Sequence, residues 1–271
     1  MLGRVLCAAI VAAAACGWAT ADAPGDPAKG TVVIADTSES VRFWWTELAL
    51  FDDQPKAWDA VASPEFSASV RALAGPFEAK IEIGALADRF VHFETFDADS
   101  LRALVLVGWN VGDWSAIVEW EGFDVFEPGI GAFYVGFNTY DVRVSRRFAA
   151  SVIGDLPDGL FHASLTAGYV ASTFDPVDKR FAELEVEWFQ PCGNGWAFAI
   201  APKLELGDYL HFGPEKRRDA IVGLRVAPIY NISEGMTMTL EGQASFAFST
   251  YSTKSGETWA VTPIFRFQVE L

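Results

Sequence analysis

The sequence predicts an all-β fold, an antiparallel up-and-down β-barrel of 12–14 strands, and three observations predict it. Apolar and polar side chains alternate with a period of two through most of the 271 residues, as strands with two different faces require. Short, glycine-ended turns alternate with longer polar loops, which is the order of connections in a meander. After residue 21, no apolar run approaches the roughly 20 residues of a membrane-spanning helix.

Residues 1–21 have the pattern of a secretory signal peptide. Arg4 supplies the positive charge, Val5 to Cys16 form an apolar stretch, and Ala19-Thr20-Ala21 is a small-x-small cleavage site. We therefore expect the mature chain to begin at Asp22. A membrane anchor is the less favoured alternative, because the stretch is too short to span a bilayer. Ala15-Cys16 resembles a lipoprotein cleavage site, but Ala13 stands where such a site usually has a large aliphatic residue, three positions before the cysteine.

The composition excludes several classes of protein. A chain that is 51% hydrophobic and 14% aromatic is not disordered. Twenty Lys and Arg against 36 Asp and Glu give a net charge of −16, which argues against nucleic acid as a partner. Cleavage after residue 21 would leave Cys192 as the one cysteine and so no internal disulfide. With three dispersed histidines besides, the chain offers no spacing of metal ligands, and we expect no cofactor.

The mature chain divides into a short lead-in and a barrel. Residues 22–39 are rich in Pro, Gly, Ala and Asp and are expected to form a periplasmic lead-in, with 32–35 as an optional short strand. The barrel is expected over residues 40–271. Fourteen strands are predicted, although twelve is equally tenable because the early ones are short and neighbours can merge. Their ranges are 40–51, 64–73, 77–86, 88–96, 102–110, 113–122, 130–139, 142–153, 159–171, 180–190, 195–207, 219–230, 235–250 and 257–271.

The connections place the two ends of the barrel in different surroundings. Short turns at 155–159, 191–195 and 231–235 alternate with long loops at 172–180, 207–219 and 250–257. All short turns, and the C-terminus, then lie at one end. Hydrocarbon requires every backbone N–H and C=O to be paired, so a sheet spans a membrane only when it closes on itself. The pattern thus predicts a transmembrane barrel with an even number of strands.

Short turns, long loops and the alternating terminal segment Phe265 to Leu271 together resemble the outer-membrane β-barrel superfamily of Gram-negative bacteria. The last residue of that class is usually aromatic, whereas here it is Leu271. The resemblance implies an outer-membrane location, with short turns in the periplasm and long loops outside. A secreted or periplasmic all-β protein is the alternative, because a soluble sandwich also alternates.

Aromatic and proline residues add two expectations. Two interfacial girdles are predicted, and ordinary core aromatics are the alternative. The girdle near the short turns comprises Trp188, Phe189, Trp196 and Tyr230, and the girdle near the long loops comprises Tyr209, Phe212, Tyr251 and Trp259. Three prolines inside strands, Pro202, Pro228 and Pro263, are expected at bulges or near the rims, because a barrel has no edge strand to tolerate a missing donor.

One pair of residues raises the question of catalysis. His162 and Ser164 share a strand face, where a base could activate a hydroxyl. His-x-Ser on a strand is similar to the motif of outer-membrane lipid A deacylases, but Leu165 stands where that motif continues with Asn. Ordinary lumen lining is the alternative, so enzymatic activity is left uncertain and is the less favoured reading.

Three carboxylates on one strand give a second lead. Glu183, Glu185 and Glu187 share a face at spacings of about 7 Å, and their mutual repulsion is tolerable only in water or beside cations. A solvated sheet face and a functional acidic wall are both compatible with this row.

The sequence predicts a small pore for passive diffusion, with an acidic, cation-preferring lumen and with outer-membrane lipid and small solutes or cations as partners. Alternatives are a lipid-modifying hydrolase using His162 and Ser164, a structural or adhesive barrel, and a periplasmic all-β protein. The sequence leaves open the solute, the oligomeric state and whether the lumen is plugged. The residues expected to line the lumen are Glu78, Lys80, Glu82, Glu183, Glu185, Glu187, Lys203, Glu205, Arg225, Glu241, Arg266 and Glu270.

Overall fold

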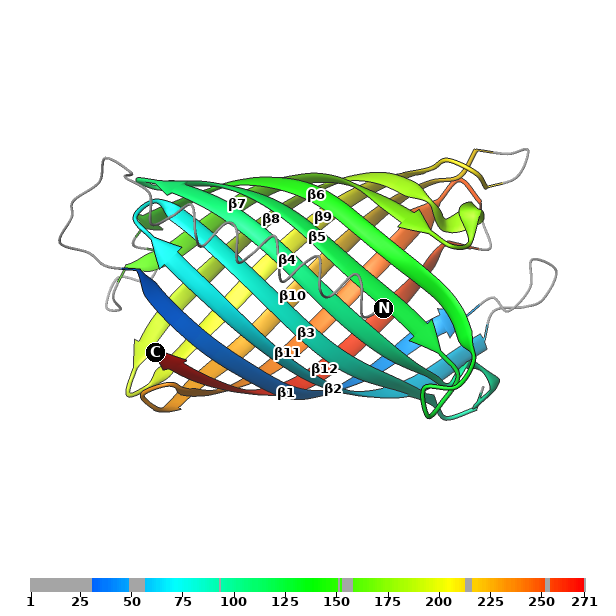
Figure 1. Cartoon of the computed structure of the whole chain (residues 1–271), viewed down its shortest axis with the longest axis horizontal. Coiled ribbons are helices and arrows are strands. Elements are labelled where there is room, and N and C mark those ends of the chain that lie inside the picture. Colours follow the sequence, from blue (N-terminus) through cyan, green and yellow to red (C-terminus); the bar gives the residue numbers. More distant parts are fainter. Residues whose placement is uncertain are drawn as a thin grey trace.

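The computed structural model shows a closed barrel of twelve strands, each antiparallel to its neighbours (Figure 1). It describes residues 31–48, 57–92, 94–150, 152, 158–212, 216–251 and 254–270. The predicted fold class is therefore confirmed, with the lower of the two strand counts. The expected signal peptide, residues 1–21, lies outside the described residues. Within the described part of the chain, no helix is long and apolar enough to cross a membrane.

The strands follow one another around the wall in chain order, and two 3-10 turns, η1 and η2, interrupt the loops. Their bounds are β1 (Val32–Leu48), β2 (Ala57–Ala74), β3 (Phe77–Phe90), η1 (Glu94–Phe96), β4 (Ala98–Val111), β5 (Trp114–Phe126), β6 (Phe133–Ala150), β7 (Gly159–Ser172), η2 (Asp175–Val177), β8 (Lys179–Gly193), β9 (Trp196–Tyr209), β10 (Arg218–Ser233), β11 (Met236–Ser249) and β12 (Gly256–Glu270).

Three boundaries differ from the sequence prediction. The expected strands at 130–139 and 142–153 are one strand, β6, because the alternation runs unbroken through Tyr140, Asp141 and Val142. No separate strand occupies 88–96, where β3 continues to Phe90 and η1 follows. These two changes reduce fourteen strands to twelve. In addition, β1 begins at Val32, so residues 32–39 belong to the wall rather than to a lead-in.

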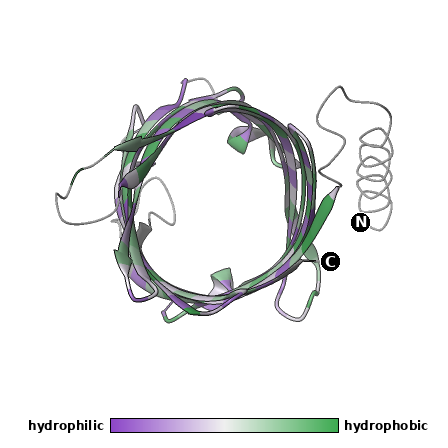
Figure 2. Cartoon of the chain, turned by 90° about the vertical axis from the view of Figure 1, so that its left-hand side faces the viewer, coloured by the Kyte–Doolittle hydropathy of each residue, from purple (hydrophilic) through white to green (hydrophobic). Residues whose placement is uncertain are grey.

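The first and last strands close the ring. β1 pairs with β12 from Ile34 opposite Glu270 to Thr46 opposite Thr258, and Figure 2 shows the resulting ring from one end. Closure gives every strand two neighbours, so the sheet has no free edge with unpaired backbone groups. Hydrocarbon would not tolerate such an edge.

The connections differ in length between the two ends of the barrel. Two-residue turns at 75–76, 112–113, 194–195 and 234–235 lie at the end that carries the C-terminus. The connections at the other end are longer, for example 91–97, 127–132, 173–178 and 210–217. The connection between β6 and β7 spans 151–158 and is longer than the turn expected at 155–159. Most of this connection lies outside the described residues.

The two faces of the wall have opposite polarity. Large apolar side chains are exposed on the outside, where Val118 is 61% exposed, Leu165 59% and Leu206 52%. The neighbouring positions along the same strands turn inward and are mostly polar, as with the buried Ser115 and Thr166, or small, as with Ala201. Apolar outside and polar inside is the reverse of a soluble protein and is the pattern of a barrel in lipid.

The mid-strand prolines interrupt single ladders without shifting the register. Beside Pro202, β8 and β9 pair at Glu185–Lys203 and again at Trp188–Ile200, and the pairs between are missing. Pro228 interrupts the β10–β11 ladder and Pro263 the β12–β1 ladder in the same way. The expectation of bulges or rim positions is therefore wrong. Each proline forgoes hydrogen bonding to one neighbour only, and the second ladder keeps the strand in place.

Candidate functional site

The acidic row on β8 faces cations from the next two strands. Lys203 Nζ lies 2.9 Å from Glu183 Oε2. Arg225 Nη2 lies 2.5 Å from Glu187 Oε2 and 3.8 Å from Glu185 Oε1. All three carboxylates thus have a cationic neighbour, which relieves the repulsion that their spacing along one strand creates.

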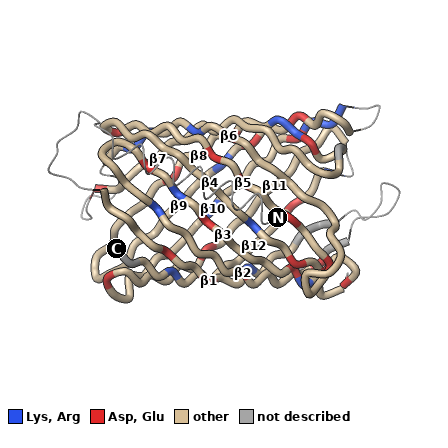
Figure 3. The backbone as a smooth tube through the Cα atoms, in the orientation of Figure 1, with Lys and Arg blue, Asp and Glu red and all other residues tan. Residues whose placement is uncertain are grey.

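The same wall continues the alternation of charge toward β11 and toward the loops. The other guanidinium nitrogen of Arg225, Nη1, lies 3.6 Å from Glu241 Oε2. Lys179 Nζ lies 2.6 Å from Glu205 Oε1, and Lys203 Nζ lies 4.0 Å from Glu205 Oε2. Figure 3 shows Lys, Arg, Asp and Glu along the length of the barrel as well as at its ends. The β8–β11 wall is therefore a network of paired charges with an excess of carboxylates.

A second network lies on β2 to β5, and Arg102 is its centre. Its Nη2 pairs with Glu82, its Nη1 lies 3.6 Å from Glu65 Oε1, and its Nε lies 3.5 Å from Glu121 Oε1. Lys80 Nζ lies 2.6 Å from the second oxygen of Glu82. The guanidinium of Arg102 thus pairs with carboxylates from three different strands. The side chains of Arg102 and of its three partners are 10–30% exposed.

A polar cavity of about 340 Å³ opens beside this network, inside the barrel. Serines of β1 and β2 and charged residues of five strands line it, and two further ion pairs border it. Arg71 Nε lies 3.2 Å from Glu78 Oε1, and Arg266 Nε lies 3.8 Å from Asp36 Oδ2. Its lining is polar enough to hold water or a hydrated ion.

The wall between the two networks is more sparsely paired. Glu119 of β5 lies opposite Asp141 of β6 in the register. Arg143 Nε donates to Thr166 Oγ1 at 3.3 Å, and the Ser115 and Ser145 hydroxyls are 2.6 Å apart. Asp141 Oδ1 is buried and accepts no hydrogen bond from the described residues.

Every predicted lining residue whose side chain is described takes part in an ion pair, from Glu78 on β3 to Arg266 on β12. The side chain of Glu270 lies outside the described residues. That these residues line an open passage stays a prediction. Sequence reasoning missed several charged residues of the inner face, namely Asp36, Glu65, Arg71, Arg102, Glu119, Glu121, Asp141, Arg143 and Lys179. For all of them except Asp36 the signal was the same alternation, since each occupies an inward position of its strand.

His162 and Ser164 share the inner face of β7, but no hydrogen bond joins them. A catalytic role for this pair stays a hypothesis. His162 lies opposite Glu187 and Arg147 in the register, and Ser164 lies opposite Glu185 and Ser145. Across the described ranges, no group of His, Cys, Asp and Glu side chains is placed to hold a metal ion.

Aromatic rings form a band on the outer face near the short turns. Phe148, Phe161, Trp188 and Phe198 follow one another across β6 to β9 with centroid separations of 5.2, 6.2 and 5.1 Å. Trp196 and Tyr230 continue the band at 4.7 Å. This arrangement matches the expected girdle at that end, except that Phe189 occupies an inward position of β8.

Near the long loops, the expected girdle is only partly present. Trp259 is on the outer face and contacts Phe246 at 5.9 Å. Phe212 instead joins Tyr209 and Tyr251 at 6.3 and 5.1 Å, and Arg217 stacks 4.0 Å above the Tyr209 ring. Tyr209 lies on the inner face of β9, so this cluster ties two loops together at the rim instead of facing lipid.

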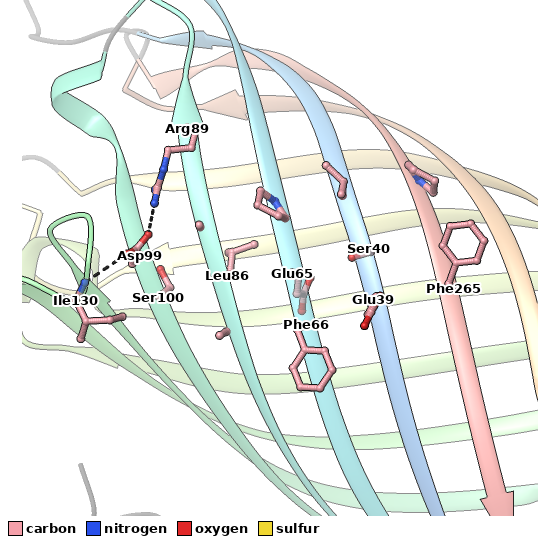
Figure 4. Close-up of a pocket in the computed structure, with 15 residues that line it drawn as sticks. Glu39, Ser40, Glu65, Phe66, Leu86, Arg89, Asp99, Ser100, Ile130 and Phe265 are labelled. Carbon is pink, nitrogen blue, oxygen red and sulfur yellow. Dashed lines mark hydrogen bonds and ion pairs between the residues drawn. The ribbon is translucent and has the colours of Figure 1, made fainter.

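The outer surface also carries a groove of about 730 Å³ over β12, β1, β2 and β3 (Figure 4). Glu39 lies in it between Phe66 and Phe265, its partners in the neighbouring strands. At the loop end, Arg89 Nη2 lies 2.5 Å from Asp99 Oδ1, and the N–H groups of Gly129 and Ile130 donate to the other oxygen of Asp99. This hollow faces away from the lumen, so it is separate from the charged interior.

The fold and the polarity of its faces define the class: the chain is a β-barrel of the outer-membrane type, as its sequence pattern indicated. No family model matches the chain, and no curated protein matches it. Among solved structures, an outer membrane channel from Pseudomonas putida F1 aligns at a TM-score of 0.55 and 8% identity, covering 92% of this chain and 100% of that one. At this identity the likeness shows the fold alone.

Two further structures are similar at lower TM-scores. The translocator domain of the autotransporter NalP from Neisseria meningitidis has a TM-score of 0.47 and 13% identity, and 97% of this chain and 95% of that one are covered. The KdgM porin has a TM-score of 0.45 and 9% identity, with coverages of 84% and 98%.

Proposed function

We propose that the protein is an outer-membrane pore through which small polar solutes diffuse passively, with a preference for cations. The observation that carries this proposal is the interior itself. Ion-paired side chains cover its walls from β2 to β5 and from β8 to β11. Among the described residues, all twelve strands lie in the wall. Paired charges hold the wall in shape and still present a hydrated surface to a solute.

The cation preference rests on the balance of charge along the β8–β11 wall. Its ion pairs involve five carboxylates, Glu183, Glu185, Glu187, Glu205 and Glu241, and three cations, Lys179, Lys203 and Arg225. The difference of 3 − 5 leaves this wall at −2. A surplus of carboxylates lowers the energy of a cation in the lumen and raises that of an anion. Because most carboxylates have a cationic neighbour, the preference is a modest one.

Location and orientation are part of the proposal. A signal peptide would direct the chain to export, and the polarity of the wall would place the barrel in the outer membrane. The short turns and the C-terminus would then lie in the periplasm, with the connections at 91–97, 127–132, 173–178 and 210–217 outside.

Planar-bilayer recording tests the pore directly. The purified protein, shown to be folded by a mobility shift on boiling, should produce stepwise conductance. The reversal potential under a salt gradient should have the sign of cation preference. A folded barrel that inserts without conductance would contradict the proposal and would favour a plugged or structural barrel.

A further inference from the structure

The outer face of β8, β9 and β10 carries two arginines in one row at the loop end. Arg180 lies opposite Asp208, and Asp208 lies opposite Arg218. All three occupy outward positions, in phase with the exposed Leu184, Leu206 and Val222 further along the strands. The row therefore has two cations for one carboxylate.

The arginines of this row are largely unengaged. Arg180 is exposed and makes no ion pair or hydrogen bond with another described side chain. Arg218 Nε lies 3.4 Å from Asp208 Oδ1, and the two side chains are 67% and 50% exposed. A pair so exposed contributes little stability, so the folded protein does not need these two arginines to hold the wall together.

The next outward row toward the middle of the membrane is entirely apolar. Leu206 lies between Ala182 and Ala220, and Ala220 in turn lies opposite Phe248. Small residues on either side of Leu206 hollow the surface, while Phe248 projects and is 61% exposed. A groove of about 680 Å³ is lined by these residues together with Arg180, Asp208 and Arg218.

We propose that this groove binds a phosphate-bearing lipid of the leaflet at the loop end, with an acyl chain over the alanines and the phosphate held by the exposed guanidinium groups of Arg180 and Arg218, which together outweigh the charge of Asp208. Guanidinium groups bind phosphate oxygens through paired, charge-assisted hydrogen bonds. Cations at the headgroup level also attract anionic lipid. The apolar floor directly below the cations fits one molecule that has both a phosphate and a chain, which a free anion lacks.

The opposite end of the barrel offers a contrast. There the outer face carries the aromatic band, and Arg146 lies over the Trp114 ring at 5.5 Å. This arginine has the same chemistry and also lies on an outward position, but an aromatic ring rather than an apolar groove lies beside it. Arg146→Ala is therefore the matched control for substitutions at the lipid site.

Native mass spectrometry of the detergent-solubilised, folded protein tests the proposal with diphosphoryl lipid A as the probe. The wild type should bind it, and the Arg180→Ala/Arg218→Ala double variant should bind about 30-fold more weakly, on the usual contribution of each interfacial cation. Arg146→Ala should bind like the wild type. Ala220→Phe, which fills the groove, should weaken binding while both arginines remain.

Three results would overturn the lipid site. The first is undiminished binding to the double variant. The second is equally tight binding of dephosphorylated lipid A to the wild type. The third is competition by inorganic phosphate as effective as that by lipid A, which would indicate a site for a free anion.

The site rests on the membrane location proposed above, but it can be tested separately from the pore. Arg180 and Arg218 are on the outer face, so the double variant should keep wild-type conductance in planar bilayers. Phosphate-dependent lipid binding by a barrel that never conducts would support the lipid site and contradict the pore. Conductance without such binding would do the opposite.

Discussion

Replacing Arg225 by glutamine removes the cation that three carboxylates share. Its guanidinium lies 2.5 Å from Glu187, 3.6 Å from Glu241 and 3.8 Å from Glu185. The side chain is only 29% exposed, and it faces the interior. Glutamine keeps a polar side chain at the position, so the variant should assemble, since inward-facing substitutions mainly tune selectivity. The wall would change from −2 to −3.

The size of the effect follows from Coulomb's law. An ion passing about 5 Å from the lost charge interacts with it by about 0.8 kcal/mol in water, or about 0.4 kcal/mol with screening at 0.15 M salt. The change favours a cation and disfavours an anion by equal amounts. The permeability ratio of cation to anion should therefore rise about fourfold at 0.15 M salt and only about 1.7-fold at 1 M, where the Debye length is about 3 Å.

Reversal potentials in planar bilayers at the two salt concentrations measure this ratio. Glu185→Gln should lower the permeability ratio of cation to anion, because it removes one negative charge and the wall changes from −2 to −1. Arg225 would keep Glu187 and Glu241 as its partners. Arg146→Gln makes the same chemical change on the outer face and should leave the ratio unchanged. If Arg225→Gln conducts with unaltered selectivity at both concentrations, the carboxylates of this wall are not on the path of the ions.

Three further outcomes are expected. Leu184→Arg should impair assembly, measured as loss of the boiling-dependent gel shift, because Leu184 is 49% exposed on the outer face and an arginine in the membrane midplane costs about 2–4 kcal/mol; normal assembly would mean that the faces are assigned the wrong way round. A tag inserted in 210–217 should be labelled on intact cells and one in the 234–235 turn should not, and the reverse result would invert the orientation. N-terminal sequencing of exported protein should begin at Asp22, whereas an intact Met1 or a lipid on Cys16 would exclude cleavage after Ala21.

Alternation alone located most strands, because lipid outside and water inside impose the same period on every strand. It failed where polar residues resemble a connection. The segment Asp36, Thr37, Ser38 and Glu39 has no apolar residue and reads as a lead-in, yet it is the middle of β1. What makes it a strand is pairing with β12 and β2 on both sides. That pairing depends on residues far away in the sequence.

The charged interior was predictable residue by residue but not pair by pair. Glu187 and Arg225 each occupy an inward position, which the sequence shows. Their contact depends on the register of β8, β9 and β10, and they are 38 positions apart. Without that register, the sequence shows Glu183, Glu185 and Glu187 as a row of carboxylates with no cations beside them. The same limit explains Tyr209, whose proximity to a loop is visible in the sequence but whose inward direction and stacking under Arg217 depend on the fold.

The closing seam has a consequence for the order of events during biogenesis. Ile34 pairs with Glu270, so the first strand waits for its partner until 270 − 34 = 236 further residues have been made. Until then both β1 and the growing edge opposite it carry unpaired N–H and C=O groups, which neither tolerate hydrocarbon nor stay inert toward other chains. In a membrane, burial of these two edges in hydrocarbon would therefore have to await the closing of the ring, and loss of β12 would leave β1 and β11 without a neighbour on one side.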